Sequence, residues 1–174
     1  MSKIIRIGGG GGFYGDSSVA PRQLIEAGID YLIMDYLAEA TMSALSQMKA
    51  KHESLGYALD LVDWIWKENM QRLKETGTKL VTNAGGLNPQ ACAARMKAMA
   101  EEAGLSFNFA VVDGDDLLPR VSDFAKAGVK ELYKGDDFPA VEDVASMNAY
   151  LGAGPIASAL AAGADVVITG RVVD

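Results

Sequence analysis

Short apolar runs of strand length alternate along this chain with segments of helical period, and this alternation constrains the fold more than any other feature. Each helical segment ends at a glycine or in a polar turn, and the next apolar run follows soon after. This order is typical of βα units around a parallel sheet, because parallel neighbours need a crossover connection. We therefore predict an α/β fold with an open, mostly parallel, Rossmann-like sheet flanked by helices, with strands at 4–7, 31–34, 79–82, 107–112 and 166–169.

The longest predicted helix covers residues 57–76, where the spacing places Trp64 and Ile65 on one apolar face with Leu61 and Leu73. The tryptophans are expected to be core or interface anchors. The other predicted helices begin near a proline or in a polar turn and end near a glycine. They cover residues 21–27, 89–103, 117–127 and 155–163.

The composition limits the kind of partner that the chain can have. A chain of 174 residues with 49% hydrophobic content can bury the core of one domain, so we predict a single domain over residues 1–174. There are 16 Lys and Arg against 23 Asp and Glu, with no basic run, so nucleic acid is not an expected partner. No apolar run is long enough to span a membrane, the start lacks a signal peptide, and Cys92 is the lone cysteine. These features predict a cytoplasmic protein.

Polar residues follow each predicted strand. Because ligands of an open parallel sheet bind outside the carboxyl ends of its strands, we expect these residues to cluster at one rim. Asp35 and Asn83 should then lie close together, although strand ends also favour Gly, Asn and Asp in ordinary turns. The cluster is predicted to contain Gly12, Ser17, Asp35, Asn83, Gly86, Asp113 and Arg171.

The glycine run after the first strand contains Gly10, Gly12 and Gly15 in the spacing GxGxxG, and Asp35 lies 20 residues further on. This spacing is typical of dinucleotide binding, so an NAD(P)-dependent oxidoreductase is one alternative. Two observations oppose it. Consecutive glycines satisfy such patterns by chance, and Pro21 indicates that the helix begins several residues after Gly15 instead of inside the glycine run.

A second candidate for anion binding precedes the helix at 89–103. Asn88 is a well-formed N-cap before Pro89, and the amides of Gly85 and Gly86 ahead of it are expected to face an anion. An ordinary helix cap explains Asn88 equally well but leaves Asn83 in need of a partner.

Acidic residues supply the other candidate chemistry. Asp35 or Glu39 is the candidate acid or base. The acidic stretch of Asp113, Asp115 and Asp116 suits Mg²⁺, but a turn is favoured there, and no metal site is predicted. The chain has two other side chains that are often reactive, a cysteine and a histidine, but both are expected to be structural. Cys92 is expected in the core and His52 on the surface.

Several motifs together resemble the acyclic terpene utilisation family AtuA. They are Phe13-Tyr14-Gly15-Asp16-Ser17, Asp35-Tyr36-Leu37-Ala38-Glu39, Thr82-Asn83-Ala84-Gly85-Gly86-Leu87-Asn88-Pro89, Gly114-Asp115-Asp116 and Thr169-Gly170-Arg171-Val172-Val173-Asp174. The resemblance covers nearly the whole chain. It implies a cytoplasmic bacterial-type protein linked to the breakdown of branched terpenoid acids as CoA thioesters, with no firmly assigned reaction. Members of the family continue past the last motif, so we expect this chain to be the N-terminal part of a longer protein, truncated after a strand.

The first functional hypothesis is an enzyme, or the ligand-binding part of one, that acts on a small acyl substrate such as a CoA thioester at the rim. Asn83 and Arg171 would orient the acyl group, and the loop glycines would hold phosphate or carboxylate oxygens. A hypothesis of another class is a non-catalytic subunit that docks a partner through the face of Trp64 and Ile65. A homo-oligomer is left open.

Overall fold

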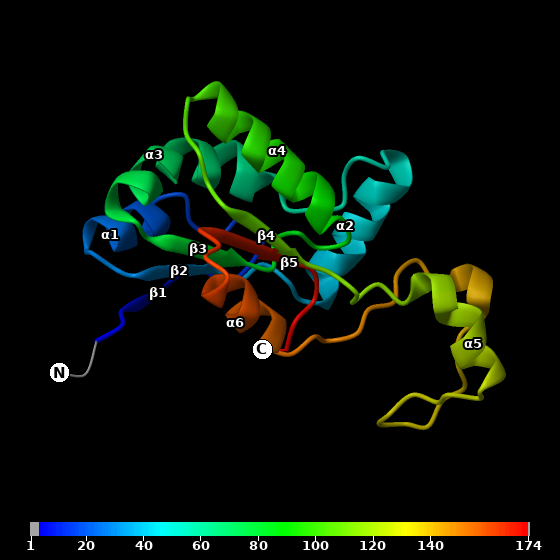
Figure 1. Cartoon of the computed structure of the whole chain (residues 1–174). Helices are drawn as coiled ribbons and strands as arrows, with labels where there is room; N and C mark the ends of the chain where they lie inside the picture. The colour runs from blue at the N-terminus through cyan, green and yellow to red at the C-terminus, as the bar shows by residue number, and fades with distance from the viewer. Residues whose placement is uncertain (1–3, 174) are drawn as a thin grey trace.

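Residues 4–173 of the computed structural model are described here, and they contain a five-stranded parallel sheet with the order β1-β2-β3-β5-β4 (Figure 1). The predicted open parallel sheet is confirmed. Strand β5 lies between β3 and β4, so the chain reverses its direction across the sheet after β4. The strands are β1 Ile7–Gly11, β2 Tyr31–Met34, β3 Lys79–Thr82, β4 Phe109–Val112 and β5 Val166–Thr169.

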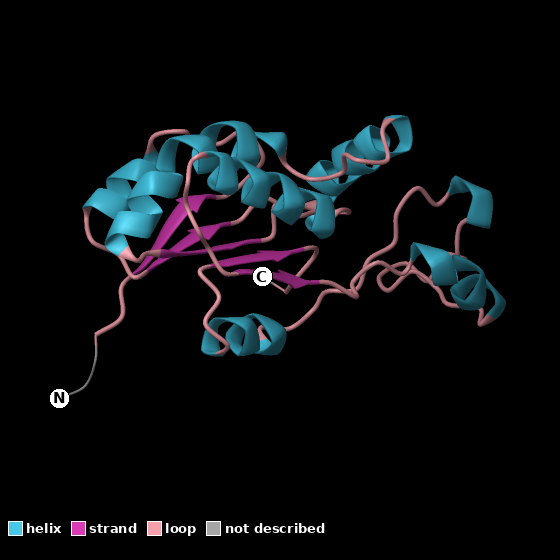
Figure 2. Cartoon of the chain, turned by 45° about the horizontal axis from the view of Figure 1, so that its top comes forward, coloured by secondary structure: helices cyan, strands magenta, loops and turns pink. Residues whose placement is uncertain are grey.

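Helices cover both faces of the sheet, but unequally. Helices α1, α3 and α4 lie on one face and α6 lies on the other (Figures 1 and 2). Helix α2, which follows β2, is not among the helices predicted from the sequence. The α-helices are α1 Ala20–Glu26, α2 Glu39–Lys51, α3 Lys67–Thr76, α4 Pro89–Glu102, α5 Val121–Lys126 and α6 Gly154–Ala161. A π-helix, η1 Leu61–Trp66, precedes α3, and two 3₁₀ turns are η2 Leu118–Arg120 and η3 Val141–Asp143.

The first strand was predicted at 4–7 but begins at Ile7 and runs through the glycines. Neighbouring side chains pack closely over two of these glycines. A Cβ on Gly8 would lie 2.9 Å from Ile29 Cδ1, and a Cβ on Gly10 would lie 2.7 Å from Met34 Sδ. Gly10 is therefore a strand residue and not part of a loop, contrary to prediction.

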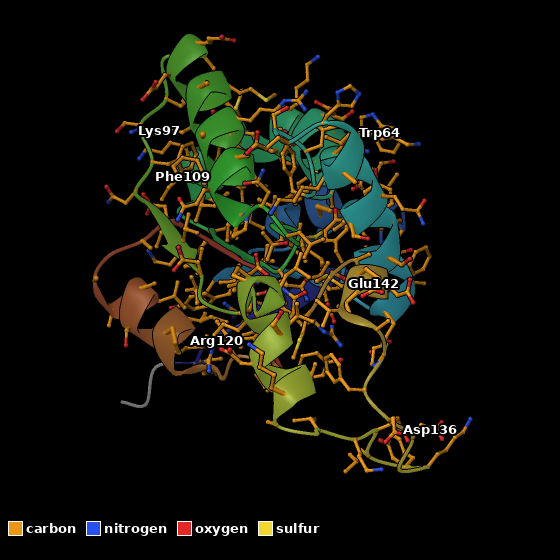
Figure 3. All side chains as sticks on the ribbon, turned by 90° about the vertical axis from the view of Figure 1, so that its right-hand side faces the viewer. Trp64, Lys97, Phe109, Arg120, Asp136 and Glu142 are labelled. Atoms are coloured by element: carbon orange, nitrogen blue, oxygen red, sulfur yellow. The ribbon has the colours of Figure 1, made fainter. Side chains whose placement is uncertain are left out.

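The helix predicted over 57–76 begins as the π-helix η1, and this changes which tryptophan is buried. A π-helix has more residues per turn than an α-helix, so the predicted apolar face is broken. Trp66 is fully buried, whereas Trp64 is 55% exposed and lies on the outside of the helical layer (Figure 3). Ile65 is buried, so the predicted common face of Trp64 and Ile65 is wrong.

The larger core lies between the sheet and the layer of α1, α3 and α4. Trp66 is at its centre, where its Nε1 donates to the Met96 carbonyl at 2.9 Å and its ring meets Phe107 edge to face. Cys92 is fully buried in this core, as predicted, and burial raises the pKa of its thiol to about 12. A smaller core forms between the sheet and α6 and includes Val167.

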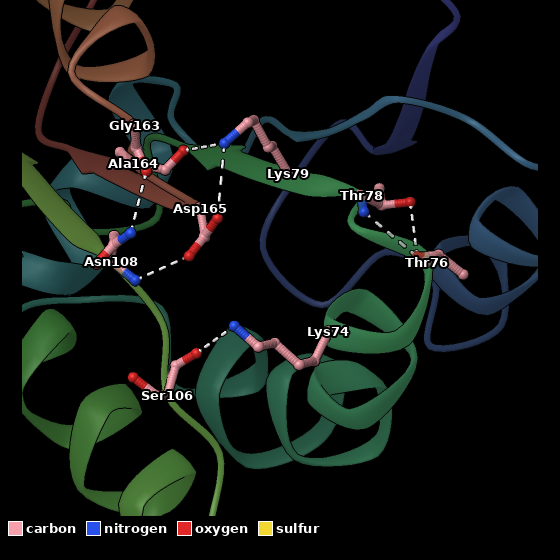
Figure 4. Close-up of polar contacts among 9 residues, drawn as sticks. All are labelled: Lys74, Thr76, Thr78, Lys79, Ser106, Asn108, Gly163, Ala164 and Asp165. Atoms are coloured by element: carbon pink, nitrogen blue, oxygen red, sulfur yellow. Dashed lines mark hydrogen bonds and ion pairs between the residues drawn. The ribbon is translucent and has the colours of Figure 1, made fainter.

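Polar contacts join the amino-terminal ends of three strands, on the edge of the sheet opposite to the predicted rim (Figure 4). Lys79 Nζ donates to the Ala164 carbonyl at 2.6 Å and lies 3.6 Å from the Asp165 carboxylate. Asp165 also accepts the Asn108 N–H at 2.9 Å. These contacts fix β3, β5 and the start of β4 relative to one another. Nowhere in residues 4–173 is there a helix both long and apolar enough to cross a membrane.

Residues 117–147, here called the arm, project away from the sheet between β4 and α6 (Figures 1 and 3). The helix predicted at 117–127 is the 3₁₀ turn η2 followed by the shorter α5. Within the arm only Val121 is buried. The Leu117 N–H donates to the Met147 carbonyl at 2.7 Å and closes the base of the arm, and Asp115, just before the arm, accepts the Arg171 N–H from the body.

Candidate functional site

The centre of the rim is a hydrogen-bonded pair formed by Asp35, after β2, and Asn83, after β3. Asn83 Nδ2 donates to Asp35 Oδ1 at 2.6 Å, and Asn83 Oδ1 accepts the Tyr36 N–H at 2.7 Å. The predicted proximity of Asp35 and Asn83 is therefore confirmed. Asn83 is buried and Asp35 is exposed. The buried amide thus holds an exposed carboxylate in one orientation.

An apolar pocket of about 220 Å³, here called the rim pocket, lies beside this pair. It is formed at the carboxyl ends of β2, β3 and β5 together with α6. Its lining is mostly aliphatic, and Asp35 and Asn83 are among its few polar members. The lining residues are Ile33, Met34, Asp35, Val81, Thr82, Asn83, Ile156, Thr169, Val172 and Val173. The site thus places a carboxylate next to an apolar chamber.

Arg171, after β5, lies at the same edge of the sheet but faces a different hollow. This second hollow, here called the arm cleft, has a volume of about 400 Å³ and lies between α2 and the end of the arm. Arg171 is buried, donates to the Leu37 carbonyl, and stacks on Tyr150 with 4.3 Å between Cζ and the ring centroid. Arg171 and Asn83, which we expected to orient one acyl group together, line separate hollows.

Glu39, at the start of α2, also lines the arm cleft. Its carboxylate accepts the Tyr150 hydroxyl at 3.0 Å. A backbone hydrogen bond at the helix start, the Tyr150 hydroxyl and the Arg171 charge lower the pKa of Glu39. A carboxylate with a lowered pKa stays ionised at neutral pH and is a weak base, so Glu39 is less suited to proton transfer than we predicted. Tyr150 was not predicted as a site residue, because it lies in a stretch without periodic pattern.

The predicted phosphate-binding loop after β1 is occupied by carboxylates of the chain itself. The Gly12 N–H donates to Asp16 Oδ2 at 3.0 Å, and the Gly15 N–H donates to Asp60 Oδ2 at 2.9 Å. An incoming phosphate would meet two negative charges and two amides that are already bonded. The loop therefore differs from an anion-binding loop.

The start of α1 also differs from a dinucleotide fold. The helix begins at Ala20, well after Gly15, and the Ser17 hydroxyl accepts the Ala20 N–H at 3.1 Å. In a dinucleotide fold the helix starts inside the glycine run, so that its N-terminus meets the pyrophosphate. Ser17 thus has a structural role at the helix start, and the fingerprint geometry is not formed.

The loop before α4 uses its polar groups internally as well. The Gly86 N–H donates to the Asn83 carbonyl at 3.1 Å, so the expectation of a free amide there is wrong. A Cβ on Gly85 would lie 2.5 Å from the Thr169 carbonyl oxygen, which explains the glycine by close packing. Asn88 caps α4 by accepting the Ala91 N–H at 3.3 Å.

The acidic residues after β4 have separate structural partners. Asp115, which is buried, accepts the Arg171 N–H at 2.8 Å and Asn148 Nδ2 at 2.9 Å, so it joins the residues that flank the arm to the segment after β5. Asp113 accepts Gln90 Nε2, and Asp116 accepts the Leu118 N–H. No group of three or more metal-ligating side chains occurs among the residues that the structure describes. Asp174, the last residue of the family motif, lies outside the described residues, and His52 is exposed as predicted.

Asp60 and Tyr36 form a buried pair that sequence reasoning did not identify as a site. Burial raises the pKa of Asp60, partly offset by the Gly15 N–H, and burial followed by the Asp60 charge raises the pKa of Tyr36. Asp60 lies between two leucines in a helical pattern, so the sequence carries no signal for its burial. Asp60, at the start of η1, holds the loop after β1 through the Gly15 N–H.

An open parallel sheet with helices on both faces and a pocket at the carboxyl ends of its strands defines a doubly wound α/β protein. Residues 5–174 match the family described as Acyclic terpene utilisation family protein AtuA, and the chain belongs to this family. Membership implies involvement in acyclic terpene utilisation. Comparison with curated proteins and with solved structures returned no match.

Proposed function

We propose that this chain is an enzyme, or the ligand-binding part of one, that acts on a small branched acyl substrate as its CoA thioester. The observation that carries the proposal is the Asp35–Asn83 pair in the lining of an apolar pocket. An aliphatic lining with a few convergent polar groups is the usual composition of a small-molecule site. Acyclic terpenes are themselves branched and apolar, which agrees with the family.

Each part of the rim pocket has a role in this proposal. Ile33, Val81 and Val172 pack against the acyl chain and keep water from it. Asp35 accepts or returns the proton that the reaction moves, and Asn83 is a positioning residue that fixes its carboxylate. A volume of about 220 Å³ suits the acyl end of the thioester, so the CoA portion would extend outside the pocket.

The observations favour this function over the two alternatives. Nucleotide binding needs open amides after β1, and those of Gly12 and Gly15 are bonded to carboxylates. Docking through Trp64 needs a shared apolar face, and its neighbour Ile65 is buried. The proposal includes a cytoplasmic location, which rests on the sequence and on the family's expected pathway.

Replacement of Val172 by phenylalanine tests the position of the acyl chain. Val172 is partly exposed and lines the rim pocket, so a larger ring there should fill the pocket without a large loss of stability. We expect the affinity for a branched acyl-CoA thioester, measured by thermal shift, to fall about tenfold or more, which corresponds to about 1.4 kcal/mol.

Val129→Phe is the matched control, because Val129 is exposed on the arm and does not line the rim pocket. It should bind the thioester as the parent does. Equal affinity of V172F and the parent would contradict the proposal. Stabilisation of the parent by NAD(P) and not by the thioester would support the nucleotide alternative instead.

A further inference from the structure

The arm cleft is the second large hollow at the carboxyl ends of the strands, and the function proposed above makes no use of it. It shares no lining residue with the rim pocket. One wall is α2, with Met42, Ser43 and Ser46, and the other is the end of the arm, with Val144 and Ser146. The cleft therefore combines aliphatic and hydrogen-bonding surface.

Buried positive charge distinguishes this cleft from the rim pocket. The Arg171 side chain is only 5% exposed, and its ring contact with Tyr150 and its bond to the Leu37 carbonyl hold the guanidinium in place. Two carboxylates, Glu39 and Asp143, also line the cleft, but both residues are exposed. Solvent screens exposed charges more strongly than buried ones, so the buried cation has the stronger effect on a bound group.

Glu39 lies near Arg171 but is held loosely. Its carboxylate is 3.9 Å from Arg171 Nη2, longer than a hydrogen bond, and its side chain is 84% exposed. A carboxylate of a ligand could take this position with a shorter, charge-assisted contact to the guanidinium. Displacement of Glu39 would move an exposed side chain and break its hydrogen bond from the Tyr150 hydroxyl.

We propose that the arm cleft binds an amphipathic carboxylate. The ligand carboxylate takes the place of the Glu39 carboxylate beside Arg171 and Tyr150, and its short apolar chain lies between Met42 and Val144. Glu39 is then an internal counter-ion that the ligand displaces. The inference does not depend on the proposed acyl-thioester function, because the two hollows have no residue in common.

Glu39→Gln provides the sharpest test, because the change removes one negative charge from an exposed side chain and keeps its size. The probe is 3-methylbutanoate, followed by NMR titration of the full chain at the backbone amides of Tyr150 and Arg171. We expect E39Q to bind this carboxylate about two- to fivefold more tightly than the parent, the effect of one exposed ion pair. The neutral 3-methylbutanamide should bind at least tenfold more weakly than 3-methylbutanoate, both to the parent and to E39Q.

Glu142→Gln is the control, since Glu142 is an exposed carboxylate of the arm that does not line the cleft (Figure 3). It should leave the affinity unchanged, and V172F should also leave it unchanged while it blocks the rim pocket. The proposal is overturned if E39Q binds the carboxylate no better than the parent, if the amide binds equally well, or if V172F abolishes binding. If E142Q also binds the carboxylate more tightly than the parent, the effect comes from the net charge of the chain, and the proposal is again overturned.

Discussion

Replacement of Trp66 by alanine is expected to lower the free energy of unfolding by about 3–5 kcal/mol. Trp66 is fully buried, and its ring meets both Phe107 and Phe109 edge to face, with centroids 4.9 and 5.6 Å apart. The substitution leaves a cavity at the centre of the larger core and removes the donor to the Met96 carbonyl. Because domains are stable by only about 5–15 kcal/mol, this is a large fraction of the total.

Trp64→Ala is the matched control, because this tryptophan is two residues away and 55% exposed. Its replacement should change the free energy of unfolding by less than about 1 kcal/mol. Urea unfolding of the two variants gives the comparison, and Trp66→Phe supplies a milder change if W66A does not fold. Equal losses of unfolding free energy in W64A and W66A would contradict the arrangement in which the π-helix buries Trp66 and exposes Trp64.

Asp35→Asn is expected to slow turnover of the branched acyl-CoA substrate by about 10²–10⁴-fold, the usual contribution of a general acid or base. The amide has nearly the shape of the carboxylate but cannot take up a proton. Stability should change little, because Asp35 is exposed. Consumption of the thioester, followed by mass spectrometry, measures the effect.

Asp113→Asn is the control for this change. Asp113 follows β4 at the same edge of the sheet, is exposed, and accepts only the Gln90 amide among the described residues. Turnover by D113N should match that of the parent. An unchanged rate in D35N, or equal losses in D35N and D113N, would remove Asp35 from the proposed chemistry.

The strands β2, β3 and β5 have the bounds predicted from the sequence, whereas β4 begins at Phe109 instead of residue 107 and β1 lies later than predicted. The three confirmed strands are short apolar runs, so hydrophobicity alone locates them. Strand β1 consists largely of glycine, which has low strand propensity. Side chains of Leu24, Ile29 and Met34 pack closely over Gly8 and Gly10, and such tertiary packing leaves no local signal in the sequence.

Part of the candidate site could be predicted from the order of strands and helices. Asp35 and Asn83 follow adjacent parallel strands, and such strands end at the same edge of a sheet, so their contact follows from the order of elements. The arm cleft could not be predicted, because Tyr150, which follows the arm in a stretch without periodic pattern, contacts Glu39 from 111 residues away. The sequence also does not indicate that Asp16 and Asp60 occupy the amides of the glycine loop.

An NMR titration of the parent chain with a branched acyl-CoA thioester tests the rim pocket as the acyl site most directly. Saturable shifts are expected at the backbone amides of Asp35, Tyr36 and Asn83 and at the Asn83 side-chain amide, which contacts the Asp35 carboxylate. The amides of Gly12 and Gly15 should not shift, because they stay bonded to Asp16 and Asp60. Shifts confined to Gly12 and Gly15, or no saturable shift at Asn83, would contradict the rim pocket as the acyl site.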